Sequence, residues 1–335
     1  MRDPKLFSTR HIVACTKGVR TNCTTHLLIA PDGELDLVPF DALLDEQGHY
    51  LVERFSVTYL TTGRDLLRMK APRQSKSPAL LVADPLFDEA ANTILAKAER
   101  PKSVPANARR SITSGQKLSD VYFAPLIGTE REAHAIQALF PDATMLTGAQ
   151  ATKAALERAD APQILHIATH GFFLEDQENN SSADSADAAS EAANPLLRSG
   201  LALAGANSKR GGVSGGILTA LEASNLNLWG TKLVTLSACD TGIGNVKNGE
   251  GVYGLRRAFV LAGAETLVMS LWPVSDEITR ERMTSYYAGL KKGLGRGEAL
   301  RQTQLAMLKR KDRVHPFYWA SFIQSGEWAN LKGKR

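Results

Sequence analysis

Cysteine is scarce in this chain of 335 residues, which contains only Cys15, Cys23 and Cys239. Three cysteines make a poor disulfide framework, and no spacing of cysteine and histidine is typical of a zinc site. Long apolar runs are also missing: no stretch approaches the roughly 18 residues that span a bilayer, and the first residues lack the apolar core of a signal peptide. We therefore expect a cytoplasmic protein in a reducing compartment, with no membrane contact, no metal and no cofactor.

A strong excess of one charge is absent as well. The sequence has 40 basic and 35 acidic residues, a net charge of +5 and a pI near 9.0. Basic residues gather in two stretches, 97–110 and 309–313, without interleaved aromatic side chains that could stack on bases. These stretches predict solvated surface, and direct binding of nucleic acid is not expected.

The chain has enough apolar residues, 43% of the total, for a large core, and its length favours two domains or subdomains. Residues 1–88 predict a small α/β subdomain, with strands at 26–30, 35–38, 51–59 and 79–83 and a short helix at 64–69. Residues 89–120 are polar and basic, which predicts a linker or mobile loop.

From residue 121 to residue 335, predicted helices alternate with predicted strands. This alternation is typical of a mostly parallel sheet that helices cover on both faces. An acidic insertion at 175–193 has no aromatic residue, lysine or arginine, so we expect a disordered loop, either an idle insertion or a regulatory segment. The predicted helices are 130–140, 152–158, 251–262, 276–292 and 296–310, and the predicted strands are 144–146, 163–168, 232–238 and 266–271.

Two of these strands end at a potentially reactive side chain. The first, Ile-Leu-His-Ile-Ala-Thr-His-Gly, ends at His170 and Gly171; the second, Leu-Val-Thr-Leu-Ser-Ala-Cys-Asp-Thr-Gly, ends at Cys239 with Gly242 three residues on. Parallel strands end at one edge of a sheet, so neighbouring strands would bring the histidine and the cysteine together. An imidazole beside a thiol favours the thiolate, as in a cysteine hydrolase. The alternative is a small apolar cysteine and a hydrogen-bonded structural histidine.

Several motifs of this chain resemble those of the CHAT domain. This caspase-like module belongs with separases, caspases and gingipains, and in bacteria it is often fused to tetratricopeptide repeats. The resemblance runs from about Leu27 to Gly326 and implies a caspase-like αβα sandwich with a mostly parallel central sheet, preceded by a smaller α/β, pseudo-caspase-like subdomain. The motifs that carry it are residues 166–171, 236–242, 249–251, 270–274 and 315–320.

The resemblance implies a cysteine endopeptidase with a His-Cys dyad. Cys239 would attack a peptide carbonyl, and His170 would assist thiolate formation or protonate the departing amine. The backbone N–H groups of Gly171 and Cys239 would form an oxyanion hole, because glycine lets a carbonyl approach closely. Asp240, next to the nucleophile, would contact substrate, orient the site or cap the following turn. The four-residue spacing of His166 from His170 predicts a separate, structural histidine on the same strand face.

Substrate specificity is predicted from Asp276, which follows the strand at 266–271 and so reaches the same edge. The segment resembles one in separases whose aspartate helps to receive an arginine before the scissile bond, although Pro273 here replaces the first aspartate of that segment. A carboxylate in the pocket would favour Arg or Lys in the substrate. The alternative is that Asp276 caps the helix that follows.

Two other functions remain open: a catalytically idle scaffold or signalling adaptor, and an acyl hydrolase or transferase that acts on a non-peptide substrate. For the peptidase we expect a protein substrate and an activating partner, such as a tetratricopeptide-repeat or sensor module. No 34-residue repeat occurs in the chain itself. The glycine-rich stretch that contains Lys209 and Arg210 is either a solvated loop or a site of autoprocessing after one of these two residues.

Overall fold

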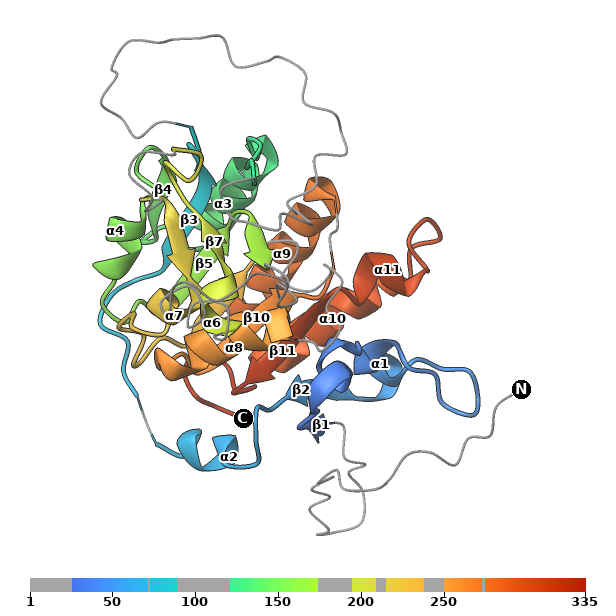
Figure 1. The fold of residues 1–335 in the computed structure, drawn as a ribbon. Helices are drawn as coiled ribbons and strands as arrows, with labels where there is room; N and C mark the ends of the chain where they lie inside the picture. The colour runs from blue at the N-terminus through green and yellow to red at the C-terminus, as the bar shows by residue number, and fades with distance from the viewer. Residues whose placement is uncertain are drawn as a thin grey trace, which may run out of the picture.

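The structure is a computed structural model that describes residues 26–71, 73–88, 121–173, 195–208, 215–237, 250–272 and 275–335. Its centre is a sheet whose described strands run in the order β1-β2-β11-β10-β9-β5-β3-β4 (Figure 1). Every neighbouring pair is parallel except β10 and β11. The mostly parallel sheet that the sequence predicts is therefore confirmed. The strands are β1 (His26–Ile29), β2 (Ser56–Tyr59), β3 (Leu80–Pro85), β4 (Thr144–Gly148), β5 (Ile164–Ala168), β9 (Leu233–Leu236), β10 (Thr266–Ser270) and β11 (Phe322–Gly326).

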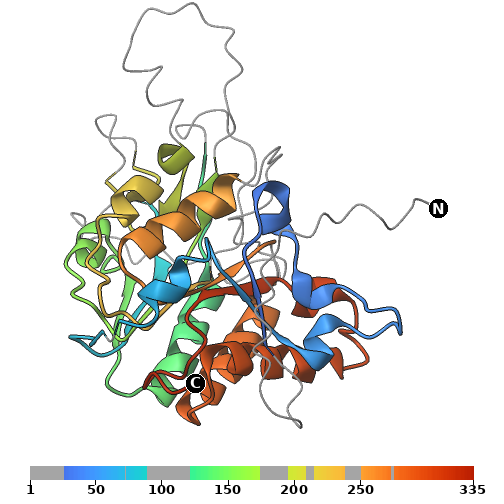
Figure 2. The ribbon, with the colours of Figure 1, turned by 90° about the horizontal axis from the view of Figure 1, so that it is seen from below.

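Alternating strand residues pack against two helical layers. Leu165, Ile167 and Leu236 face α8 and α7, whereas Ile164 and Leu233 face α3, α9 and α10. Strands buried on both faces are almost continuously apolar, as β5 and β9 are. Figure 2 shows α8 in orange on one side of the sheet, and green α3 with red α10 on the other. The helices are α3 (Ile127–Leu139), α4 (Lys153–Glu157), α6 (Pro195–Arg198), α7 (Ala220–Ala223), α8 (Glu250–Leu261), α9 (Asp276–Lys291), α10 (Arg296–Leu308) and α11 (Pro316–Trp319).

One predicted strand near the start of the chain is wrong, and another is confirmed only in its second half. The predicted strand 35–38 is largely a 3-10 helix, η1 (Gly33–Leu37), and a second short 3-10 helix, η2 (Phe40–Ala42), follows it. The predicted strand 51–59 begins as the helix α1 (Leu51–Arg54) and becomes β2 only at Ser56. The Glu53 carboxylate accepts a hydrogen bond of 2.7 Å from the Tyr50 backbone N–H, which satisfies a donor at the start of α1. Such local contacts end the strand that the apolar pattern alone suggests.

The other predicted elements of this block are confirmed: the helix near 64–69 is present as α2 (Asp65–Arg68), and the strands 26–30 and 79–83 are present as β1 and β3. Strands β1, β2 and β3 all lie in the central sheet, β1 and β2 beyond β11 and β3 beside β5. The division of the chain at residues 88 and 120 stays a prediction, because residues 89–120 lie outside the described part.

A second, antiparallel sheet was not predicted. It consists of β6 (Gly171–Phe173), β7 (Ser199–Ala202) and β8 (Ile217–Thr219), and it begins directly after His170. Its strands have three or four residues, too few for a clear period-two pattern. The predicted insertion 175–193 and the pair Lys209 and Arg210 lie outside the described residues.

Candidate functional site

His170 lies in the turn between the two sheets. It follows the last residue of β5 by two positions and immediately precedes β6. The His170 carbonyl accepts a hydrogen bond of 2.9 Å from the Ala202 N–H, and the neighbouring Thr169 hydroxyl donates to the Ala202 carbonyl. These bonds fix the turn at the edge of the central sheet where β5 and β9 end. The His170 side chain is only 1% exposed.

The imidazole of His170 is oriented by a backbone carbonyl. Its Nε2 lies 2.7 Å from the carbonyl oxygen of Ala124, in the segment before α3. A carbonyl can only accept, so Nε2 carries a proton and Nδ1 is the basic nitrogen of the neutral ring. The rings of Phe87 and Phe123 lie 5.2 and 5.8 Å from the imidazole, centroid to centroid. Protein groups rather than solvent therefore set the tautomer and the orientation of the ring.

Asn207 ties together the two segments that hold His170. Its side chain accepts from the Phe123 N–H and donates to the Phe123 carbonyl, both at 2.9 Å. Its amide nitrogen also lies 2.9 Å from the Asp88 carboxylate, and its backbone N–H donates to the Phe87 carbonyl at 2.8 Å. Sequence reasoning missed Asn207, Ala124, Phe87 and Phe123, because they come together only in the tertiary structure.

The second motif strand, β9, lies directly beside β5. Ile167 pairs with Leu236, and the Ser237 N–H continues the ladder with a bond of 2.9 Å to the Ile167 carbonyl. In the sequence, His170 is three residues beyond Ile167 and Cys239 three residues beyond Leu236. Cys239 and Asp240 lie outside the described residues, so their meeting with His170 stays a prediction.

Gly171 is buried and is the first residue of β6, where it pairs with Leu201. The backbone of Gly171 thus lies next to His170 at the edge of the sheet where the motif strands end. Its predicted part in an oxyanion hole stays a prediction.

Asp276 reaches the same edge from another element. It is the first residue of α9, and Ser275 before it is the N-cap, whose hydroxyl accepts from the Ile278 N–H at 3.5 Å. The alternative that Asp276 caps this helix is therefore wrong by one residue. Its carboxylate instead packs against the first turn of α3: a Cβ added to Gly128 would lie 2.3 Å from Asp276 Oδ2. Gly128 is four residues beyond Ala124, so Asp276 lies near the segment that orients His170.

His166 has a different environment, although it belongs to the same motif. It is fully buried inside β5, with Nε2 at 3.2 Å from Glu132 of α3 and Nδ1 at 3.1 Å from the Tyr287 hydroxyl of α9. The Tyr287 hydroxyl in turn lies 2.9 Å from Thr235 of β9, and burial raises the pKa of Tyr287 well above its usual range, so this hydroxyl stays protonated. The prediction of a structural histidine is confirmed. The expected shared face with His170 is wrong, because β5 ends at Ala168.

The described residues contain no group of three or more His, Cys, Asp or Glu side chains arranged to hold a metal ion. Among the helices of the described part, none is both long and apolar enough to cross a membrane.

The described part of the chain is thus an α/β protein in which helices cover both faces of a mostly parallel sheet, with His170 just beyond the end of a central strand. A comparison with family models then gives the family: the CHAT domain matches residues 9–327, so the chain belongs to the CHAT family. This match covers the two strand-end motifs and the residues around His170.

Two curated proteins are similar to the chain, tetratricopeptide repeat protein 28 of human and of mouse. Each is 27% identical over 320 residues, which is 91% of this chain but only 12% of the relative. Among solved structures, a chain of the yeast separase–securin complex is similar. The match covers 91% of the present chain and 16% of the chain in that complex, with 12% sequence identity and a TM-score of 0.49. The chain thus spans a small part of the proteins that it resembles.

Proposed function

We propose that this chain is a cysteine endopeptidase of the CHAT type, with Cys239 as nucleophile and His170 as general base and acid. The register of β5 and β9 is the observation that carries the proposal. It pairs Ile167 with Leu236, and the two residues of the proposed dyad follow at equal distances along the sequence. Membership of the CHAT family supports the same roles.

The proposed reaction uses Nδ1 of His170 as the proton acceptor, since Nε2 donates to the Ala124 carbonyl. The Cys239 thiol gives its proton to His170, and its sulfur attacks the peptide carbonyl carbon. The C–N bond breaks, His170 protonates the departing amine, and an acyl thioester remains. Water then attacks the thioester with His170 as base, which releases the carboxylic acid and the thiol.

Backbone donors would stabilise the negative oxygen of each tetrahedral intermediate. We assign this role to the N–H groups of Gly171 and Cys239, as the family resemblance implies. Gly171 supports this assignment by its place directly beside His170 at the start of β6. Asp240, next to the nucleophile, would orient the site or contact the substrate.

Asp276 would favour substrates with Arg or Lys before the scissile bond. Its support is its position over the first turn of α3, close to the segment that orients His170. A carboxylate at that place would pair with a guanidinium or ammonium group and repel an acidic side chain. A caspase-like preference for aspartate is therefore not expected.

Activation by a partner is part of the proposal. His170 is 1% exposed and its ring packs against Phe87 and Phe123, so a substrate would need the groups around His170 to move before it reached the ring. A tetratricopeptide-repeat or sensor module would supply that change, and the similarity to a tetratricopeptide repeat protein fits such a context. Low activity of the isolated chain is the consequence.

The test is labelling of the full chain by two peptidyl acyloxymethyl ketones that differ only in Arg or Asp before the reactive ketone. We expect the arginine probe to label the chain, and Cys239→Ala to abolish labelling while the matched double variant Cys15→Ala/Cys23→Ala retains it. Labelling that survives Cys239→Ala would remove the assigned nucleophile. Labelling of the isolated chain should be slow and should rise with an activating partner. If neither probe labels the chain under any activating condition, including high protein concentration and an added tetratricopeptide-repeat partner, the catalytically idle scaffold is the better description.

A further inference from the structure

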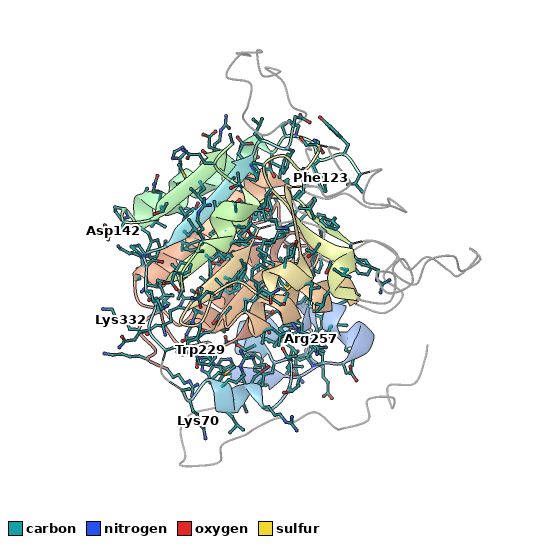
Figure 3. All side chains as sticks on the ribbon, turned by 60° about the vertical axis from the view of Figure 1, so that its left-hand side comes forward. Lys70, Phe123, Asp142, Trp229, Arg257 and Lys332 are labelled. Atoms are coloured by element: carbon teal, nitrogen blue, oxygen red, sulfur yellow. The ribbon has the colours of Figure 1, made fainter. Side chains whose placement is uncertain are left out.

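A cavity of about 570 Å³ lies at the edge of the central sheet opposite His170. Lys232 and Glu265, the residues directly before β9 and β10, line it together with Gly326 at the end of β11. Figure 3 shows Phe123, next to His170, at the far end of the molecule from Lys70 and Lys332, which also line the cavity. This cavity is therefore separate from the proposed peptidase site.

Arg296, the first residue of α10, lies in the wall of the cavity. It is fully buried, its Nε donates to the Ala329 carbonyl at 2.7 Å, and its Nη1 contacts the Lys232 carbonyl and the Glu265 carboxylate. Its Nη2 has no hydrogen-bond partner among the described residues. Burial lowers the pKa of Arg296 from its ordinary value, although Glu265 opposes this effect. A buried guanidinium nitrogen without an acceptor is costly, and an anion in the cavity would supply that acceptor.

The walls and mouth of the cavity carry an excess of positive charge. Seven basic and three acidic side chains line it. Each carboxylate already has basic partners, among them Lys232 at 2.6 Å from Glu265 and Arg335 at 2.7 Å from Glu327. No carboxylate of the described residues forms an ion pair with Lys70, Arg73 or Lys332. An anion in the cavity could therefore pair with Lys70, Arg73 and Lys332.

The electrostatics of Arg73 agree with this picture. Burial lowers the pKa of Arg73, and the nearby positive charge of Arg68 lowers it further. The Arg73 guanidinium lies over the Trp229 ring, 3.8 Å from its centroid, and donates to the Gly263 carbonyl at 3.0 Å. No aromatic side chain of the described residues lines the cavity itself, so it offers no surface on which a base could stack, which disfavours a nucleic-acid strand here.

We propose that this cavity binds a small organic polyphosphate, with its phosphate groups between Arg296 and the exposed lysines Lys70 and Lys332. Planar guanidinium groups pair with phosphate oxygens in a bidentate way, and lysines add charge at longer reach. A cavity of this volume accommodates a ligand of nucleotide size. The proposal concerns binding alone and does not depend on peptidase activity.

Isothermal titration calorimetry of the full chain with pyrophosphate, ATP, adenosine and citrate tests the proposal. We expect ATP and pyrophosphate to bind, adenosine not to bind, and citrate to bind at least tenfold more weakly than ATP. The exposed mouth pair Lys70→Gln/Lys332→Gln should weaken ATP binding about tenfold or more. The control pair Lys309→Gln/Lys311→Gln removes the same charge from exposed positions outside the cavity and should leave binding unchanged.

Several results would overturn the proposal. Absence of binding by both ATP and pyrophosphate removes the site. Equal weakening by the mouth pair and the control pair assigns the binding to general surface charge. Citrate binding as tight as ATP binding contradicts the preference for phosphate. If a single-stranded RNA binds more tightly than ATP, and the Lys70→Gln/Lys332→Gln variant loses that binding, the ligand is a nucleic acid rather than a small molecule. Arg296→Lys gives a second check, because lysine retains the charge but lacks the planar guanidinium that can bind two phosphate oxygens. A variant that unfolds at the wild-type temperature should bind ATP more weakly.

Discussion

His166 and His170 lie four residues apart in one motif but have different surroundings. His166, inside β5, contacts a carboxylate and a hydroxyl from the two helices α3 and α9. His170, beyond the strand end, contacts one backbone carbonyl and two phenylalanine rings. Both are almost fully buried, so burial does not distinguish them. The place where the strand ends decides which histidine stabilises the fold and which lies at the edge where chemistry is proposed.

The largest expected effect is on the rate of probe labelling when His170, at the edge of the sheet, is replaced. His170→Ala should lower the rate of labelling by the arginine probe about 10²–10⁴-fold, because it removes the group that takes the thiol proton. The matched control is His134→Ala, which changes an exposed histidine of α3 and should label at the wild-type rate. A labelling rate in His170→Ala within threefold of wild type would contradict the role of His170.

The histidine inside the strand should affect stability instead. His166→Ala removes the imidazole that lies 3.2 Å from the buried Glu132 carboxylate and leaves a cavity at a fully buried position, so we expect it to lower the free energy of unfolding by about 2–4 kcal/mol. Urea denaturation measures this loss. The double variant His166→Ala/Glu132→Gln, which removes the buried charge, should recover part of it. A loss below about 1 kcal/mol would mean that the polar network is not a stabilising unit.

Gly128 lies between the residues that contact the two histidines, Ala124 and Glu132. Gly128→Ala would force a Cβ to within 2.3 Å of Asp276 Oδ2 and 2.7 Å of Asp276 Cβ, so α3 or α9 must shift. We expect a loss of about 1–3 kcal/mol in the free energy of unfolding and a weaker preference for the arginine probe over the aspartate probe.

The matched control for this prediction is Gly215→Ala, since a Cβ at Gly215 meets nothing within 4 Å. It should leave both stability and probe preference unchanged. If Gly128→Ala lowers stability but keeps the probe preference, Asp276 packs against α3 without selecting substrate.

The smallest expected effect belongs to Asn207, which acts on the His170 region alone. Asn207→Ala removes the hydrogen bonds to Phe123 and Asp88, so we expect a loss of about 1–2 kcal/mol in unfolding free energy and a several-fold slower labelling. Asn225→Ala, at an exposed position of the same chain, is the control. An unchanged labelling rate in Asn207→Ala would show that the hydrogen bonds of the Asn207 side chain do not position His170.

Strong periodic segments of the fold could be predicted from the sequence. The strands at 163–168 and 266–271 and the helices at 276–292 and 296–310 all appear within two residues of their predicted bounds. The segment 51–59 was misjudged, because a hydrogen bond from Tyr50 to Glu53 starts a helix inside an apolar run. The strands β6, β7 and β8 were missed because each is too short to carry a period.

For the candidate site, the strands that carry the motif residues could be predicted from the sequence, because apolar β-branched runs and their endings are local properties. The roles of His170, Gly171, Cys239 and Asp276 stay predictions. The tertiary structure decided which strands are neighbours, that Ala124 orients His170 and that Ser275 rather than Asp276 caps α9. It alone gathered the basic side chains of residues 68–73, 232, 296 and 332–335 around one cavity. These contacts join residues far apart in the chain, and packing between elements rather than local preference sets them.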